Sequence, residues 1–562
     1  MAGTWPRSRR TDLQGRRANA IFDPITWSQT PIPCKFHVIA LYKAAAIYLL
    51  TRLNRAAFSP DRKGIMTLRC VGWVSLVSLI WLSWCSGANA QDTSPDLSLT
   101  GSFDRTDHET YREVPFRVPR GTHRLTVEFT YTGQADRSVI DLGLRDPVRF
   151  RGWSGGNKAR IVIEEADATP SYLPGPVTSG IWKLVLGVPN IRSGKSAAFQ
   201  ARIWFDNDAD ALAVMEAPIN PSFGWYRGDL HMHTAHSDGT CASQRGARVP
   251  CPVFKTLMSA TERHLDFIAI TDHNATSQNH SIRELAPYFD DLLVISGREI
   301  TTFEGHANLF GPTGFIDFQL GGPRAPNLGP ILAQIEAKGG VLSVNHPALP
   351  SGETCMGCGW TYADTDWSRV PAMEVINGAS LALFGAEGPF SGVAFWEQRL
   401  NSGFRIAAIG GSDNHDPAKG PPIGTPTTVV HAQNLSQKEI LRAIRQGHVF
   451  VDVWGRGDLM LAVLATAGST TVEMGDELLV AVGKPISVKV TVAGVPAGAR
   501  LSLAGNGSEL AGLGSLAVLS PQDSRTFSFL ADEHPQWLRF DVRDQDGKLL
   551  ALGNPIYLRP AP

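Results

Sequence analysis

The sequence predicts an α/β protein in which a central domain of alternating strands and helices lies between two small all-β domains. Apolar, β-rich runs alternate with helical patterns over residues 223–455, and the segments on either side show polar–apolar alternation with a period of two. The length of 562 residues allows three or four domains of ordinary size. With 43% hydrophobic and 19% charged residues, the composition excludes a wholly disordered chain.

Residues 66–90 are predicted to be a secretory signal peptide. Arg69 precedes an uncharged apolar run over residues 71–84, and Ala88-Asn-Ala90 follows it. The run is too short for a comfortable membrane span, so we expect cleavage after Ala90, an exported protein (periplasmic or secreted) and no stable membrane anchor. The alternatives are an uncleaved anchor and, less favoured, a lipoprotein attached at Cys85. Because a chain begun at Met66 would have a signal of ordinary length, residues 1–65 are interpreted as a non-native or disordered extension.

Four of the seven cysteines lie beyond the predicted signal. An even number of cysteines in an exported chain indicates disulfide bonds. We expect Cys241 to pair with Cys251, whereas Cys355 and Cys358 can pair with each other or with the first two. A structural zinc site is the less favoured alternative, because one C-x2-C motif supplies only half of a four-ligand set.

Residues 91–222 and 456–562 are each predicted to form a β-sandwich. The clearest alternating strands are predicted at residues 123–131, 160–163, 181–186, 199–205, 485–492 and 537–542. Turn residues separate these strands, and neither domain shows a chemical constellation, an internal repeat or a low-complexity tract.

Residues 223–455 alternate between buried strands and helices. Strands are predicted at 266–270, 292–295, 340–344, 373–376 and 405–409, and helices at 254–264, 330–338, 393–400 and 436–446. The last helix begins with the capping-box sequence Ser436-Gln-Lys-Glu439. Repeated alternation implies parallel pairing, either in an open sheet or in a (β/α) barrel.

The charge distribution argues against a nucleic-acid partner. The net charge is −1, but basic residues are concentrated before residue 90 and the remainder carries an excess of acids. Phosphate backbones require a basic face, so we expect a small-molecule partner instead.

Histidines and carboxylates follow the predicted central strands. The segment Gly228-Asp-Leu-His-Met-His-Thr-Ala-His-Ser-Asp-Gly239 places two histidines at i and i+2, where side chains in a strand point the same way. Further groups occur in Thr271-Asp-His-Asn274, Arg298-Glu299, Glu304-Gly-His-Ala-Asn308, Asn345-His-Pro347 and Gly411-Ser-Asp-Asn-His415. The nine candidate metal ligands are His231, His233, Asp238, His273, Glu299, His306, His346, Asp413 and His415.

This recurrence predicts a metal site at the carboxyl ends of the strands, where α/β barrels place their active sites. A lone histidine such as His431 is interpreted as an ordinary polar side chain. Imidazole and carboxylate together suit zinc, manganese or iron, whereas calcium prefers oxygen alone. A carboxylate such as Glu299 can bridge two cations.

These motifs resemble the PHP (polymerase and histidinol phosphatase) superfamily. The form W-x-R-G-D-L-H-M-H-T-x-H-S-D-G at residues 225–239 and the G-H-x-N motif after Glu299 are more similar to one branch, the exported CehA/McbA-like metallohydrolases, which includes aryl carbamate (carbaryl) hydrolases. The resemblance covers about 230 residues by motif, with all nine positions filled. It implies a distorted (β/α)7 barrel that holds two or three divalent ions (Mn, Zn or Fe).

The resemblance also implies how the nine residues divide among the metals. His231, His233, Glu299 and Asp413 would hold one ion, and Glu299 would bridge to a second held by His306 and His346. Asp238, His273 and His415 would complete a third site, with His236 as a rival of Asp238.

Four neighbouring residues are weaker candidates for orienting the ligands or binding the substrate. Asp272 and Asn274 flank His273 and either orient imidazoles or cap a turn. Arg298 is a candidate substrate anchor, with a structural ion pair as the favoured alternative. Lys419 is a still weaker candidate for the same role.

We therefore predict an exported metal-dependent hydrolase in which a metal-bound hydroxide cleaves an ester, with phosphoesters favoured. No serine or cysteine nucleophile is required. Carboxylic ester or aryl carbamate cleavage is the alternative within hydrolysis. A non-catalytic surface- or glycan-binding protein with a degenerate barrel is the alternative from another class.

Overall fold

The computed structural model describes residues 94–207, 214–215, 217–353, 355, 357–506 and 515–561. The predicted extension, signal peptide and cleavage site lie outside this part of the chain. In the described residues, no helix is both long and apolar enough to cross a membrane.

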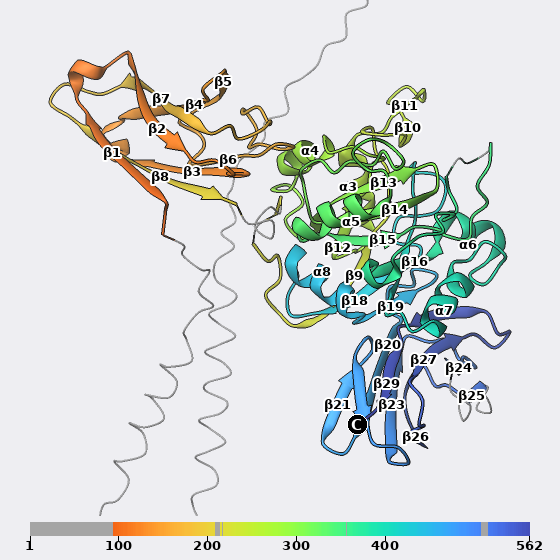
Figure 1. Ribbon diagram of the computed structural model, residues 1–562. Helices are drawn as coiled ribbons and strands as arrows, with labels where there is room; N and C mark the ends of the chain where they lie inside the picture. Colours follow the sequence, from red (N-terminus) through yellow and green to blue (C-terminus); the bar gives the residue numbers. More distant parts are fainter. Residues whose placement is uncertain are drawn as a thin grey trace, which may run out of the picture. The chain divides into compact units, whose positions relative to one another are not determined.

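The N-terminal domain consists of two four-stranded antiparallel sheets that enclose one apolar core. The sheets have the orders β1-β8-β3-β6 and β2-β7-β4-β5 (Figure 1). Their inward side chains include Trp182, Leu125 and Phe103, each almost fully buried. The strands are β1 (Leu97–Phe103), β2 (Thr110–Val118), β3 (Arg124–Tyr131), β4 (Val139–Arg145), β5 (Phe150–Gly155), β6 (Arg160–Ile163), β7 (Gly180–Asn190) and β8 (Ala197–Asp206).

Seven strands of the central domain follow one another in a mixed sheet of order β17-β16-β15-β14-β13-β12-β9. The strands β9, β12 and β13 are parallel, as are β15, β16 and β17, while β14 runs antiparallel to both of its neighbours. The strand bounds are β9 (Gly224–Asp229), β12 (Phe267–Ile270), β13 (Leu293–Thr302), β14 (Gly305–Phe310), β15 (Val341–Val344), β16 (Ala372–Asn377) and β17 (Ala407–Gly411). An isolated parallel bridge between Met232 and Asn414 joins the segments that follow β9 and β17.

Helices alternate with most of these strands. They are α3 (Val253–Glu262), α4 (Gln278–Leu285), α5 (Leu328–Ala337), α6 (Gly378–Phe384), α7 (Val393–Asn401) and α8 (Gln437–Gln446). Helix α8 begins as its sequence predicts, because the Ser436 side chain accepts a hydrogen bond from the backbone N–H of Glu439. The sequence did not predict α4 and α6.

The sequence predicts parallel pairing in an open sheet or a barrel, and the resemblance implies a distorted (β/α)7 barrel. The structure shows mixed pairing instead, because β14 is antiparallel to β13 and β15. Only Phe303 and Glu304 separate β13 from β14, and so short a connection forces an antiparallel hairpin. Between β15 and β16 the helical element is one 3-10 turn, Trp367–Arg369. The sheet is therefore a mixed α/β sheet.

The sheet continues beyond β9 into the C-terminal strands. Strand β18 (Thr427–Ala432) pairs with β9, β19 (Val449–Asp452) with β18, and β28 (Leu549–Gly553) with β19. A separate antiparallel sheet of order β21-β20-β23-β26 packs on the C-terminal part through a core that includes Leu461, Val488 and Phe540. The other C-terminal strands are β20 (Met460–Ala467), β21 (Thr470–Glu473), β22 (Glu477–Val480), β23 (Pro485–Ala493), β24 (Arg500–Gly505), β25 (Ser515–Val518), β26 (Gln522–Leu530), β27 (Gln536–Arg543) and β29 (Ile556–Pro560).

A small hairpin, β10 (Thr240–Ala242) and β11 (Arg248–Pro250), lies between β9 and α3 in the chain. The disulfide Cys241–Cys251, which the sequence predicts, closes it. Cys355 pairs with Cys358, one of the two pairings left open for it.

Candidate metal centre

The nine predicted ligands come from the ends of consecutive central strands. His231 and His233 lie just beyond β9 and His273 just beyond β12. Glu299 and His306 lie within the paired strands β13 and β14, where Glu299 is opposite Asn308 and His306 is opposite Thr301. The remaining ligands follow the next strands: His346 comes after β15, and Asp413 and His415 come after β17. Asp238 lies in the loop between β9 and β10.

The Glu299 carboxylate lies at the middle of this set and is almost fully buried. Five imidazoles surround it. The nitrogen–oxygen distances are 2.9 Å to His273, 3.2 Å to His306, 3.4 Å to His346 and 3.5 Å to both His231 and His233. No single carboxylate can neutralise five imidazoles that are all protonated, so the arrangement favours neutral imidazoles gathered around shared cations.

Two further carboxylates contact the same imidazoles. An Asp413 oxygen lies 3.1 Å from His233 Nε2 and 3.4 Å from His231 Nε2. Asp238 lies 3.4 Å from His415 Nε2, 3.8 Å from His273 Nε2 and 3.9 Å from His233 Nδ1.

The donor atoms converge as metal ligands must. Among the residues that the structure describes, four groups have ligand atoms that all lie within 4.8 Å of one another, and together they contain all nine predicted residues and no others. The groups are His233/Asp238/His273/His415, His231/Glu299/His346, His231/His233/Asp413 and His273/Glu299/His306. The Nε2 atoms of His231 and His306 are buried and have no hydrogen-bond partner. Such atoms are costly unless a ligand satisfies them, so the residues fit a bound cation.

The grouping differs in part from the division that the family resemblance implies. His231, His233 and Asp413 converge as expected, and Asp238, His273 and His415 converge together with His233. His306 and His346 fall into separate groups, each with Glu299. Glu299 is thus shared between groups, as a bridging carboxylate would be.

Outer groups orient several of the imidazoles. Glu374 Oε2 lies 2.6 Å from His231 Nδ1, and His346 Nδ1 donates to the carbonyl of Cys358 at 2.9 Å. Both contacts leave the Nε2 atom of the imidazole facing the centre, as in metal sites with a carboxylate or carbonyl behind the histidine. Asn377 Nδ2 donates to both Glu374 and Asp413.

Sequence reasoning missed Glu374 and Asn377. The strand at 373–376 was predicted, and an acidic residue inside a fully apolar run was the available signal, because a buried carboxylate requires a partner. Glu374 is 1% exposed.

The contacts within the centre shift the pKa values of its carboxylates and imidazoles. Burial by itself would raise the pKa of Glu299, yet the contacts with His231 and the other imidazoles hold it well below its usual value. Burial would likewise raise the pKa of Asp413, but the contacts with His231 and His233 outweigh it, so that this pKa is also well below its usual value. The pKa of His231 is raised despite its burial, by Asp413, Glu374 and Glu299. The carboxylates of the centre are thus stabilised in their charged form, which favours the binding of cations.

Backbone strain occurs at two of the predicted ligands. His346 has φ of 27° and Asp413 has φ of 55°, in the left-handed region that non-glycine residues rarely adopt. Strained conformations of this kind cluster at functional sites, where the surrounding structure enforces them.

The neighbouring residues have structural partners. Asp272 accepts hydrogen bonds from the Thr234 backbone and from Ser237, and Asn274 exchanges hydrogen bonds with the Thr301 backbone, so both fit the turn-capping alternative. His236 contacts Ser277 and Ser281 and belongs to none of the convergent groups.

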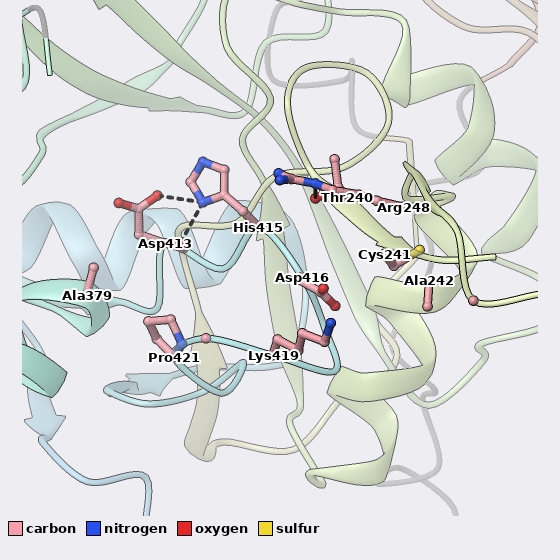
Figure 2. Close-up of a pocket in the computed structure, with 12 residues that line it drawn as sticks. Thr240, Cys241, Ala242, Arg248, Ala379, Asp413, His415, Asp416, Lys419 and Pro421 are labelled. Atoms are coloured by element: carbon pink, nitrogen blue, oxygen red, sulfur yellow. Dashed lines mark hydrogen bonds and ion pairs between the residues drawn. The ribbon is translucent and has the colours of Figure 1, made fainter. Parts of the chain in front are cut away.

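The two predicted substrate anchors lie in different environments. Arg298 is 2% exposed, and its guanidinium donates to the carbonyls of Pro312 and Gly314. These contacts support a structural role for Arg298 with backbone carbonyls as its hydrogen-bond partners, and the substrate-anchor hypothesis stays a prediction. Lys419 instead lines an open pocket beside Asp413 and His415 (Figure 2).

No protein-family model matches the chain, and no curated protein does. The solved structures that are loosely similar to it include two phosphoesterase-related proteins. One is a two-domain protein from Bacteroides vulgatus containing a predicted PHP-like metal-dependent phosphoesterase, with 18% identity and a TM-score of 0.32, covering 59% of this chain and 95% of that chain. The other is a putative metal-dependent phosphoesterase from Bifidobacterium adolescentis, with 16% identity and a TM-score of 0.26, covering 38% and 94%. At these values neither the fold nor the activity of the chain is inferred from them.

Proposed function

We propose that this protein is a metal-dependent hydrolase of the PHP superfamily, similar to the CehA/McbA-like branch, and that it cleaves esters, with phosphoesters as the first choice. One observation carries the proposal: a buried carboxylate, Glu299, lies among five imidazoles, and the buried Nε2 atoms of His231 and His306 make no hydrogen bond with the described residues. A bound cation would satisfy both nitrogen atoms.

Divalent cations bound here would supply a water of lowered pKa and stabilise negative charge that develops on the substrate. The chain's own residues would hold the cations and orient the imidazoles. Glu299 and Asp413 provide the negative charge that retains the cations. Glu374 and the Cys358 carbonyl fix the rings of His231 and His346 from behind, so that their Nε2 atoms keep one direction during turnover.

The nature of the ester is the finer part of the proposal. The pocket beside Asp413 and His415 has the cationic side chains Arg248 and Lys419 in its wall, which supports an anionic substrate and hence a phosphoester. Carboxylic ester or aryl carbamate cleavage is the competing activity, as in the branch that the sequence resembles.

Export is also proposed. The predicted signal at residues 66–90 and the disulfide Cys241–Cys251 support an oxidising compartment, where such bonds persist.

Chelation and reconstitution test the proposed function. The purified full chain is treated with chelator, dialysed, and assayed on 4-nitrophenyl phosphate and 1-naphthyl N-methylcarbamate, alone and with Mn²⁺, Zn²⁺ or Fe²⁺. We expect metal-dependent turnover, with the phosphate faster, that is lost in His231→Ala and kept in His431→Ala. A faster carbamate rate would move the enzyme to carbamate hydrolysis. Turnover of neither ester with any metal, or turnover that survives both chelation and His231→Ala, would overturn the proposal.

A further inference from the structure

A pocket of about 480 Å³ opens directly beside the candidate metal centre. Asp413 and His415 form its inner side, and the β10–β11 hairpin together with the loop 416–421 forms its walls (Figure 2). The volume is within the range of small-molecule sites. A substrate bound with its ester at the metals would extend into this space.

Two cationic side chains in the pocket wall have no acidic partner. In the described part of the chain, neither Arg248 nor Lys419 has a carboxylate oxygen within 4.0 Å. The Nε atom of Arg248 donates to Thr240 Oγ1 at 3.0 Å, and its two terminal nitrogens make no hydrogen bond with the described residues. The planar fork of Arg248 is therefore free for a carboxylate or phosphate group.

The hairpin holds Arg248 in a fixed relation to the metal centre. The backbone N–H of Thr240 donates to the carbonyl of His415 at 2.7 Å, and the Cys241–Cys251 disulfide closes the hairpin. Thr240 thus binds Arg248 through its side chain and His415 through its backbone. Figure 2 shows the Arg248 guanidinium extending toward His415. The Arg248 side chain is exposed, and the bond from its Nε to Thr240 restricts its conformations before a ligand binds.

One acidic side chain belongs to the same wall. The Asp416 carboxylate lines the pocket and accepts a hydrogen bond from the Ala418 backbone. Apart from the metal ligands, the wall thus carries two cations and one anion. Ala242, Ala379 and Pro421 add apolar surface to the lining.

We infer that the substrate carries a second anionic group, a carboxylate or phosphate separate from the scissile ester, which Arg248 binds with the support of Lys419. The inference rests on the proposed function and narrows it to esters of small acids that bear two anionic groups. The apolar part of the lining would contact the body of the substrate.

A pair of substrates with the same ester tests this inference. Phenyl phosphate and 4-carboxyphenyl phosphate differ only in the distal carboxylate. We expect the wild-type protein to favour the carboxylated ester by about tenfold in kcat/KM, through KM, because a charge-assisted hydrogen bond at a partly exposed site has about this effect. The preference should shrink at high salt.

Variants then assign the preference to the pocket. Arg248→Ala should remove most of the tenfold ratio, Lys419→Ala part of it, and Arg248→Lys should restore some. Arg245→Ala is the matched control, an exposed arginine in the same hairpin that does not line the pocket, and it should keep the ratio. A wild-type ratio near one, or a ratio that survives the Arg248→Ala/Lys419→Ala double change, would overturn the inference while the hydrolase proposal stands.

Binding without turnover separates the two proposals. Calorimetry compares terephthalate, which has two carboxylates, with benzoate, which has one. Tighter terephthalate binding that Arg248→Ala abolishes would support the second anion site even if no ester is cleaved. Equal binding of the two acids by the wild-type protein would contradict the inference.

Discussion

Histidines contact carboxylates in two regions of this molecule, and the ligand atoms converge in only one of these two regions. At the Glu299 centre, formed by the nine converging residues, one buried carboxylate contacts five imidazoles. In the second region, here called the Glu473 cluster, His431 Nδ1 lies 2.7 Å from Glu473, and His448 lies 2.9 Å from Asp476 and 3.5 Å from Glu473. The Glu473 cluster is half-buried, and its two imidazoles contact the neighbouring carboxylates of Glu473 and Asp476.

The difference shows that convergence, and not composition, defines the candidate metal site. Among the described residues, sets of three or more ligand atoms close enough to share an ion occur in the Glu299 centre and not in the Glu473 cluster. His431 stacks on Trp225, with ring centroids 4.4 Å apart, and acts as a packed polar side chain. The sequence interpretation of His431 as an ordinary histidine agrees with this geometry.

The largest expected effect comes from removing the shared carboxylate. Glu299→Gln keeps the shape of the side chain but loses the charge that would retain two cations. We expect metal affinity and kcat/KM each to fall by more than about 100-fold, beyond the range typical of outer partners. Metal content measured after dialysis checks this. The matched variant Glu473→Gln should keep its metal, and equal losses in the two variants would erase the distinction between the regions.

An intermediate effect is expected at Glu374, which contacts His231 but is not itself one of the nine predicted ligands. Glu374→Gln should weaken metal binding by about 10- to 100-fold, because His231 loses the carboxylate that orients its ring and raises its basicity. Competition with a metal-binding dye measures the dissociation constant. If Glu374 only contributed to packing, Glu374→Gln would lower the unfolding temperature and leave the metal affinity unchanged. That outcome would contradict a role for Glu374 in orienting His231.

The smallest effect belongs to the Glu473 cluster. Burial opposes but the contact with His448 dominates, so the pKa of Asp476 lies below its ordinary value of 3.8. A lowered pKa in the folded state contributes stability above the unfolded value, and this contribution is lost as the pH falls through the folded value. Asp476→Asn should therefore lower the free energy of unfolding by at most about 1 kcal/mol at pH 7, since the pair is partly exposed. Urea unfolding should show the difference vanishing well below pH 3.8, whereas a constant difference at every pH would point to packing.

The sequence predicted candidate ligands because several of them directly follow an apolar strand. His273 and His346 come immediately after short, fully buried strands, and such strands are recognisable without tertiary information. The sequence did not predict strand β14, whose residues were identified only as part of the motif Glu304-Gly-His-Ala-Asn308. Its antiparallel pairing with β13 follows from a short connection, which periodicity does not detect.

The sequence by itself determined the strand–helix alternation, the nine chemical groups and their order along the chain. It did so because buried strands and chemically unusual residues leave local signatures in the sequence. Only the tertiary structure decided that His306 and His346 meet Glu299 in separate groups, that Glu374 stands behind His231, and that Arg248 faces the pocket beside His415. These contacts join residues far apart in the chain. Their distances depend on strand register, loop path and backbone strain, which no local pattern encodes.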